Sequence, residues 1–224
     1  MIVPFGLVLR RGLSETLGAA EPAPEHAPGG HLRVAALALI VLAAATTVTY
    51  VLQYLTIYAT ATLHMPTRLG FGATAVLGLT GMIFAPLGGW LSDRFGRRPV
   101  MIIPMSLLLI LTLPGFLGIV QFRNVAWLLG VAAVLSCISA VAFGAMLAAI
   151  AEGLPQRARS GTLALVYAVA IAAFGGSAQF NVAWLTGFTH NDLAPAFYMA
   201  AGVAMGLMAM LGLRETAPVR TTRA

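Results

Sequence analysis

The sequence has no lysine, a single cysteine, and charged residues at only 9% of its 224 positions. A soluble globular domain carries roughly 25% charged residues, so this scarcity of charge excludes an ordinary soluble globule. Cys137 has no second cysteine with which to form an internal disulfide or a cysteine-based metal site. All 13 basic residues are arginines, and they lie in short connectors between apolar runs. This placement argues against a nucleic-acid partner, which requires a basic face on a folded domain.

Long apolar runs fill most of the chain, since 59% of its residues are hydrophobic. A helix needs about 20 apolar residues to cross a hydrocarbon core of about 30 Å. Charge-free segments of that length occupy residues 34–63, 71–91, 100–120, 125–151, 161–188 and 194–213. The sequence therefore predicts an all-α integral membrane protein with six transmembrane helices, placed in the lipid bilayer.

Two regions flank these runs. Residues 1–33 begin with apolar residues and continue through Arg10 and Arg11 into a stretch rich in Pro, Gly, Ala and Glu. The apolar residues precede the arginines, whereas in a signal peptide the positive charges come first. We expect this region to be the end of a preceding helix followed by a cytoplasmic linker. Residues 34–213 are then the transmembrane half-bundle, and residues 214–224 form a cytoplasmic tail.

The arginines also predict the orientation of the chain. An even number of spans places both ends of the chain on the same side of the membrane. Two arginines, Arg68 and Arg123, fall in the opposite loops, whereas the side of the termini holds Arg10, Arg11, Arg33, Arg94, Arg97, Arg98, Arg157, Arg159, Arg214, Arg220 and Arg223. Because cytoplasmic loops are enriched in Lys and Arg, both termini are expected in the cytoplasm.

A short segment between the second and third runs, GGWLSDRFGRRPV at residues 88–100, is unusually rich in charge. Residues 89–98 fit, position by position, the pattern G-x-x-x-D-[RK]-x-G-[RK]-[RK]. This pattern is the hallmark loop of the major facilitator superfamily, which carries it between the second and third helices of a half. The segment resembles that loop in both pattern and location.

Further stretches resemble one family within that superfamily, the metabolite:proton symporters of citrate and other organic acids, or of proline and betaine. These stretches are EGLPQRARSGTLALVYAVAIAAFGGSAQ at 152–179, APAFYMAAGVAMGLMAMLGLRETAP at 194–218 and PFGLVLRRGLSET at 4–16. The resemblance implies the carboxyl-terminal half of a twelve-helix facilitator in the bacterial cytoplasmic (inner) membrane. The implied function is proton-coupled symport of a small organic acid by alternating access, without a cofactor, together with a complementary amino-terminal half of six helices.

The charged segment suggests a conformational gate. We expect Asp93, Arg94, Arg97, Glu152 and Arg157 to form an ion-pair cluster that keeps the cytoplasmic side closed, with Gly89 allowing a close helix approach and Gly96 a tight reversal. The complete expected gate comprises Gly89, Asp93, Arg94, Gly96, Arg97, Arg98, Glu152 and Arg157. Alternatively, these charges only set the topology of the chain under the positive-inside rule.

Substrate contacts have to be uncharged, because the six runs contain no ionisable acid or base. Thr46, Tyr50 and Tyr54 recur at helical spacing in the first run, with Gln53 beside them. We expect Tyr50, Gln53, Tyr54 and Gln179 to bind the substrate, and the alternative is that they form hydrogen bonds between helices. Tyr58 is expected in an outer aromatic belt, and Asp192 is expected to be solvated.

Three functions therefore compete. The first is a truncated or split symporter for an organic acid or for a zwitterion such as proline. The second is a non-transporting facilitator half that acts as a membrane interaction protein. The third, an enzyme, lacks support because the sequence shows no nucleotide loop, no metal cluster and no nucleophile with its base.

Overall fold

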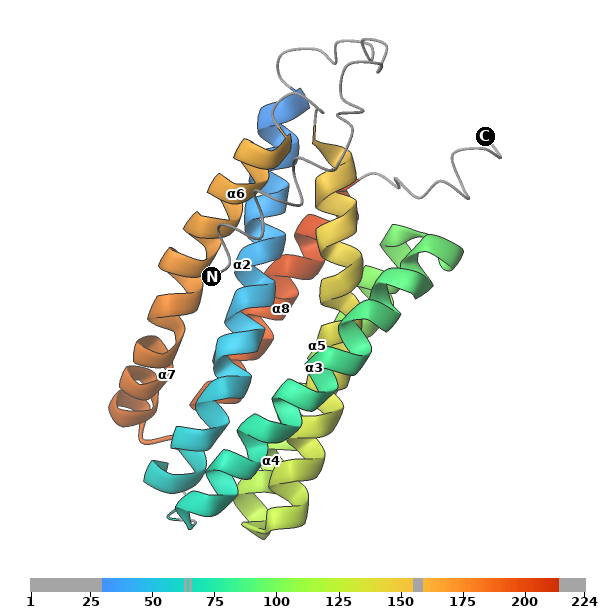
Figure 1. The fold of residues 1–224 in the computed structure, drawn as a ribbon. Helices are drawn as coiled ribbons and strands as arrows, with labels where there is room; N and C mark the ends of the chain where they lie inside the picture. Colours follow the sequence, from blue (N-terminus) through green and yellow to red (C-terminus); the bar gives the residue numbers. More distant parts are fainter. Residues whose placement is uncertain (1–29, 63, 65, 155–158, 214–224) are drawn as a thin grey trace, which may run out of the picture.

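The computed structural model of the chain describes residues 30–62, 64, 66–154 and 159–213, and this part is built from helices joined by short connections (Figure 1). The helices are α2 (Gly30–Ile57), α3 (Thr67–Phe95), α4 (Arg97–Phe122), α5 (Val125–Gly153), α6 (Arg159–Val169), α7 (Gly176–Thr189) and α8 (Ala194–Gly212), with π-helices η2 (Tyr58–Thr62) and η3 (Ala170–Gly175). The predicted linker before residue 30 and the tail after residue 213 lie outside these residues.

Six helical segments of the described part are long and apolar enough to cross a membrane. They run over Arg33–Thr62, Phe71–Phe95, Arg97–Phe122, Val125–Gly153, Ser160–Thr189 and Ala194–Gly212. The first combines α2 with η2, and the fifth combines α6, η3 and α7. The prediction of six transmembrane helices is therefore confirmed, with each span close to its predicted bounds.

Successive spans run in opposite directions, which sorts the charged residues by end (Figure 1). The starts of α2, α4 and α6 lie at the same end of the bundle as the ends of α3, α5 and α8. This end, the upper one in Figure 1, carries Arg94, Arg97 and Glu152, whereas Arg123 and Asp192 lie at the other end. The connectivity thus produces the segregation of charge that the sequence predicts.

Helix α2 is the most enclosed helix of the bundle, because residues 41–48 are buried without interruption. It packs against α8, α5, α3 and the fifth span. By contrast, α3 and the fifth span leave large apolar side chains uncovered, such as Phe71, Met82 and Phe180. Helices that are apolar on every side fit lipid or a further membrane protein outside the bundle.

Candidate functional site

The connection between α3 and α4 consists of one residue, Gly96. Its φ of 105° lies in a region that residues with a Cβ rarely adopt. The N–H of Gly96 donates a hydrogen bond to the carbonyl of Ser92 at 3.1 Å, so the reversal is tight, as predicted. Because α4 begins immediately at Arg97, the side chain of this arginine lies beside the last turn of α3.

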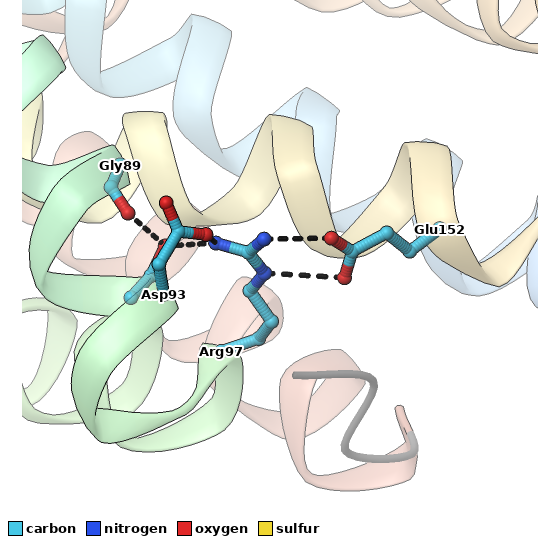
Figure 2. A network of polar contacts seen from close by, with 5 residues as sticks. Gly89, Asp93, Arg97 and Glu152 are labelled. Atoms are coloured by element: carbon cyan, nitrogen blue, oxygen red, sulfur yellow. Dashed lines mark hydrogen bonds and ion pairs between the residues drawn. The ribbon is translucent and has the colours of Figure 1, made fainter. Parts of the chain in front are cut away.

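Arg97 is the centre of a polar cluster that joins three helices (Figure 2). Its Nη1 lies 2.6 Å from Oδ1 of Asp93 on α3. Its Nη2 and Nε donate to the two carboxylate oxygens of Glu152 on α5, at 2.6 and 3.1 Å. Nη1 also donates to Oγ of Ser92, which in turn donates to the carbonyl of Gly89 at 2.7 Å. We call Ser92, Asp93, Arg97 and Glu152 the Arg97 cluster.

The geometry of the Arg97 cluster favours a strong interaction. The Arg97 side chain is 6% exposed, whereas the Asp93 and Glu152 side chains are 64% and 33% exposed. A bidentate arginine–carboxylate pair combines two charge-assisted hydrogen bonds with a fixed orientation. A buried cation that loses its partners is strongly disfavoured. The cluster can therefore hold the ends of α3, α4 and α5 together, and separation of those ends requires a new partner for Arg97.

The other predicted gate arginines lie elsewhere. The Arg94 guanidinium stacks over the Trp90 ring, 5.8 Å from its centroid, and forms no ion pair with the described residues, so its expected membership of the cluster is wrong. Arg98 donates from Nη2 to the carbonyl of Leu211 at 2.9 Å and thereby links α4 to the end of α8. Arg157 lies outside the described residues.

The close helix contact expected at Gly89 is present, but the glycine that it requires is the neighbouring Gly88. A Cβ on Gly89 would meet nothing within 4 Å, whereas a Cβ on Gly88 would collide with the backbone of Val141 on α5. From the opposite side, a Cβ on Gly144 would collide with the carbonyl of Ala85. A Cβ on Gly144 would also lie 2.9 Å from the backbone nitrogen of Gly89, so α5 does approach α3 closely at Gly89. The glycines whose missing side chains allow α3 and α5 to pack backbone to backbone are Gly88 and Gly144.

The predicted substrate contacts lie on two adjacent helices. On α2, Tyr50 is half-buried, Gln53 is exposed and Tyr54 is buried. On α7, Gln179 is half-buried. Their side chains make no hydrogen bond with the part of the chain that the structure describes. Tyr50 packs on Gly175, and α2 runs in the same direction as the fifth span (Figure 1). Gln179, one helical turn after Gly175, therefore lies level with the turn that follows Tyr50.

Tyr58 is not part of an aromatic belt, and this prediction is wrong. Its side chain is completely buried, and its hydroxyl donates to the backbone carbonyl of Asp192 at 2.6 Å. Its ring lies 6.1 Å from the ring of Phe116, between centroids. The Asp192 carboxylate lies 3.9 Å from the Arg123 guanidinium. Tyr58 thus ties the first span to the connection between α7 and α8, at the end of the bundle opposite the Arg97 cluster.

Replacing Tyr58 with phenylalanine should lower the free energy of unfolding by about 1–2 kcal/mol, because the Asp192 carbonyl loses its buried donor. Replacing Asp192 with alanine is the matched control, since that change keeps the carbonyl and removes only an exposed ion pair, which is worth about 0.5 kcal/mol. The measurement is unfolding of the purified chain in detergent, followed by circular dichroism. Equal losses in the two variants would contradict a bond to the backbone.

The described residues thus form six membrane-length helices with a charged turn at one end of the bundle. Residues 34–224 match the Major Facilitator Superfamily. The chain belongs to this superfamily of transporters and is not an enzyme.

Curated relatives of the chain are symporters and transporters. A citrate-proton symporter of Klebsiella pneumoniae is 28% identical over 233 residues, which cover 100% of this chain and 52% of that protein. A proline/betaine transporter of Escherichia coli K12 is 32% identical over 187 residues, or 81% of this chain and 36% of that protein. An inner membrane metabolite transport protein of the same organism, YhjE, is 28% identical over 195 residues, which cover 83% of this chain and 43% of that protein. The chain spans about half the length, or less, of these relatives.

Proposed function

We propose that this chain is the carboxyl-terminal half of a proton-coupled symporter that carries a small organic acid of the citrate type by alternating access. It lies in the bacterial cytoplasmic membrane with both termini in the cytoplasm. The observation that carries this proposal is the Arg97 cluster, which joins the ends of three membrane-length helices. The citrate-proton symporter, similar along the whole chain, supports the substrate class.

The Arg97 cluster acts as the gate on the cytoplasmic side. Asp93 and Arg97 lie on either side of the one-residue turn at Gly96, whereas Glu152 belongs to a separate helix, α5. While Glu152 stays paired with Arg97, the ends of α3, α4 and α5 present a fixed surface against which the complementary half closes. Loss of this pair releases α5 and opens that end, as in other two-state elements.

The substrate binds beside α2 and α7, at Tyr50, Gln53, Tyr54 and Gln179. Hydroxyl and amide groups can hydrogen-bond a carboxylate without the cost of burying a charge. The carboxylates of the described residues, Asp93, Glu152 and Asp192, all lie at or beyond helix ends. The group that carries the proton, and the opposing wall of the cavity, therefore come from a complementary amino-terminal half of six helices.

A zwitterion such as proline or betaine is the second candidate substrate. The relative with 32% identity is a proline/betaine transporter, and an uncharged site can accept the carboxylate of either substrate class. A non-transporting facilitator half, acting through another membrane protein, is the remaining alternative. This alternative fits the large apolar side chains that α3 and the fifth span leave uncovered.

Uptake of radiolabelled citrate and of radiolabelled proline separates these functions. Cells that produce the chain together with an amino-terminal six-helix half should accumulate citrate, and a protonophore should abolish the accumulation. Cells that produce either half alone should not accumulate it. Accumulation of proline alone would favour the zwitterion, and insertion without uptake of either compound would favour the interaction protein.

A further inference from the structure

The fifth span is interrupted near its middle by the π-helix η3, Ala170–Gly175. The N–H of Gly176 donates to the carbonyl of Ile171, five residues earlier, so this turn is wider than an α-helical turn. Wide turns of this kind are rare in proteins, and those that do occur are often found at functional sites. The pair Gly175-Gly176 lies at the C-terminal end of η3, where α7 begins.

The start of the wide turn lies beside a hydroxyl of α2. Oγ1 of Thr46, which is 5% exposed, lies 3.0 Å from the carbonyl oxygen of Ala43 in its own helix and 3.4 Å from the carbonyl oxygen of Ala170, and its single proton is shared between these two acceptors. Widening of a helix weakens the internal pairing of its carbonyls, and a hydroxyl from a neighbouring helix can satisfy them. Thr46 therefore places a hydroxyl beside the start of η3, on the first span.

The end of η3 contacts the next turn of the same face of α2. A Cβ on Gly175 would lie 2.8 Å from Cε2 and 3.1 Å from Cδ2 of the Tyr50 ring. Gly175 is buried, so the ring of Tyr50 rests directly on the glycine backbone. The hydroxyl of Tyr50 makes no hydrogen bond with the described residues. Only a residue without a side chain permits this position of the ring.

We propose that Gly175 is a positioning residue: it seats the ring of Tyr50 on the π-helix and leaves the tyrosine hydroxyl free for the carboxylate of the substrate. The inference rests on the proposed function, in which Tyr50 contacts the substrate. It adds the reason for the break in the fifth span, since η3 brings a glycine to Tyr50. Any side chain at position 175 displaces the ring and lowers substrate affinity.

Gly175→Ala and Gly176→Ala form a matched pair, because a Cβ on Gly176 would meet only the Ile171 carbonyl, at an ordinary 3.7 Å. The first readout needs no substrate: fluorine NMR of the chain labelled with 3-fluorotyrosine in detergent, with the Tyr50 signal assigned from Tyr50→Phe. Gly175→Ala should move the Tyr50 signal and leave that of Tyr198 in place. Gly176→Ala should move neither signal.

The second readout is citrate uptake by the chain together with its complementary half. Gly175→Ala and Tyr50→Phe should each raise KM about five- to tenfold, as expected for one lost hydrogen bond, with kcat nearly unchanged. The double variant should be no worse than either single variant. Gly176→Ala should keep the KM of the unmodified chain.

The outcomes separate the two proposals. If Tyr50→Phe leaves KM unchanged although Gly175→Ala moves the Tyr50 signal, the substrate role of Tyr50 is wrong and the inference falls with it. If Tyr50→Phe raises KM and Gly175→Ala changes neither KM nor the signal, the inference alone is wrong. Should Gly175→Ala fail to fold, Gly175→Ala with Tyr50→Ala must restore folding by removing the ring, and failure to restore it would also overturn the inference.

Discussion

The double variant D93N/E152Q is expected to lose about 3–5 kcal/mol of unfolding free energy, the cost of leaving a buried charge without its partner. The loss should exceed the sum of the losses in the two single variants. Either carboxylate alone still pairs with the Arg97 guanidinium, whose side chain is only 6% exposed. Removal of both negative charges leaves a desolvated cation whose neighbours in the Arg97 cluster, two amides and the hydroxyl of Ser92, are all uncharged.

The comparison variant is Arg97→Gln, which removes the charge that needs pairing. The Asp93 and Glu152 side chains then remain, but they are 64% and 33% exposed and can be solvated. We expect a smaller loss, about 1–3 kcal/mol, from the lost hydrogen bonds. The measurement is denaturant unfolding of each purified chain in detergent. A loss in Arg97→Gln equal to or larger than that in the double variant would show that the Arg97 cation is not the costly group.

The same variants test the gate. A loss of 3 kcal/mol in the closed form shifts the balance between closed and open forms by about a hundredfold, because each 1.4 kcal/mol is a factor of ten. Uptake by D93N/E152Q together with the complementary half should therefore fall by at least tenfold while the amount of inserted protein is unchanged. Unchanged uptake would leave the charges with a topological role only.

The number and bounds of the spans could be predicted because the bilayer imposes one requirement on every segment. Each run must supply about 20 apolar residues and place its charges at the ends, and this property is visible in a linear sequence. The pairing of Arg97 with Glu152 was predictable for a related reason. Glu152 is the only acidic residue next to a predicted span on that side of the membrane before residue 214, apart from Asp93 itself, so few pairings were possible.

The rotation of each helix about its axis was not predictable. A helix that is apolar on all sides has no polar face to indicate which residues point inward, and the choice between Gly88 and Gly89 depends on that rotation. The burial of Tyr58 depends on it too, since an aromatic residue near a span end fits both the lipid interface and a packed position. The direction of Arg94 depends on the position of Trp90, one turn earlier on an exposed face.

Ser92 and the π-helix η3 were not predicted, although residues of the sequence lie where a signal for each could be sought. Ser92 lies within the motif, next to Asp93, and its hydroxyl reaches both Arg97 and the carbonyl of Gly89. The π-helix η3 ends at Gly175, the first residue of the pair Gly175-Gly176. A glycine pair predicts an irregular turn, but it does not predict the residues that contact the turn, Thr46 and Tyr50, because they belong to another helix.

Gly88→Ala should destabilise the bundle by about 3 kcal/mol, at the upper end of the usual cost of overpacking, whereas Gly89→Ala should change the stability by less than about 0.5 kcal/mol. These glycines are neighbours in α3 with similar local propensity, so helix propensity cannot separate their variants. They differ in what a methyl group would meet, which is the backbone of Val141 for Gly88 and open space for Gly89. A backbone obstacle cannot rotate away as a side chain can.

Gly144→Ala tests the same contact from α5, because its methyl group would meet the carbonyl of Ala85. Gly130→Ala in the same helix is the control, because its methyl group would meet nothing within 4 Å. Thermal unfolding of the four variants in detergent should therefore separate Gly88 and Gly144 from Gly89 and Gly130. The stability losses of Gly88→Ala and Gly144→Ala should not add when the two changes are combined. Either change alone pushes α3 away from α5, so the other then meets helices that have already separated. Additive losses, or equal losses at Gly88 and Gly89, would mean that the two helices do not pack backbone to backbone.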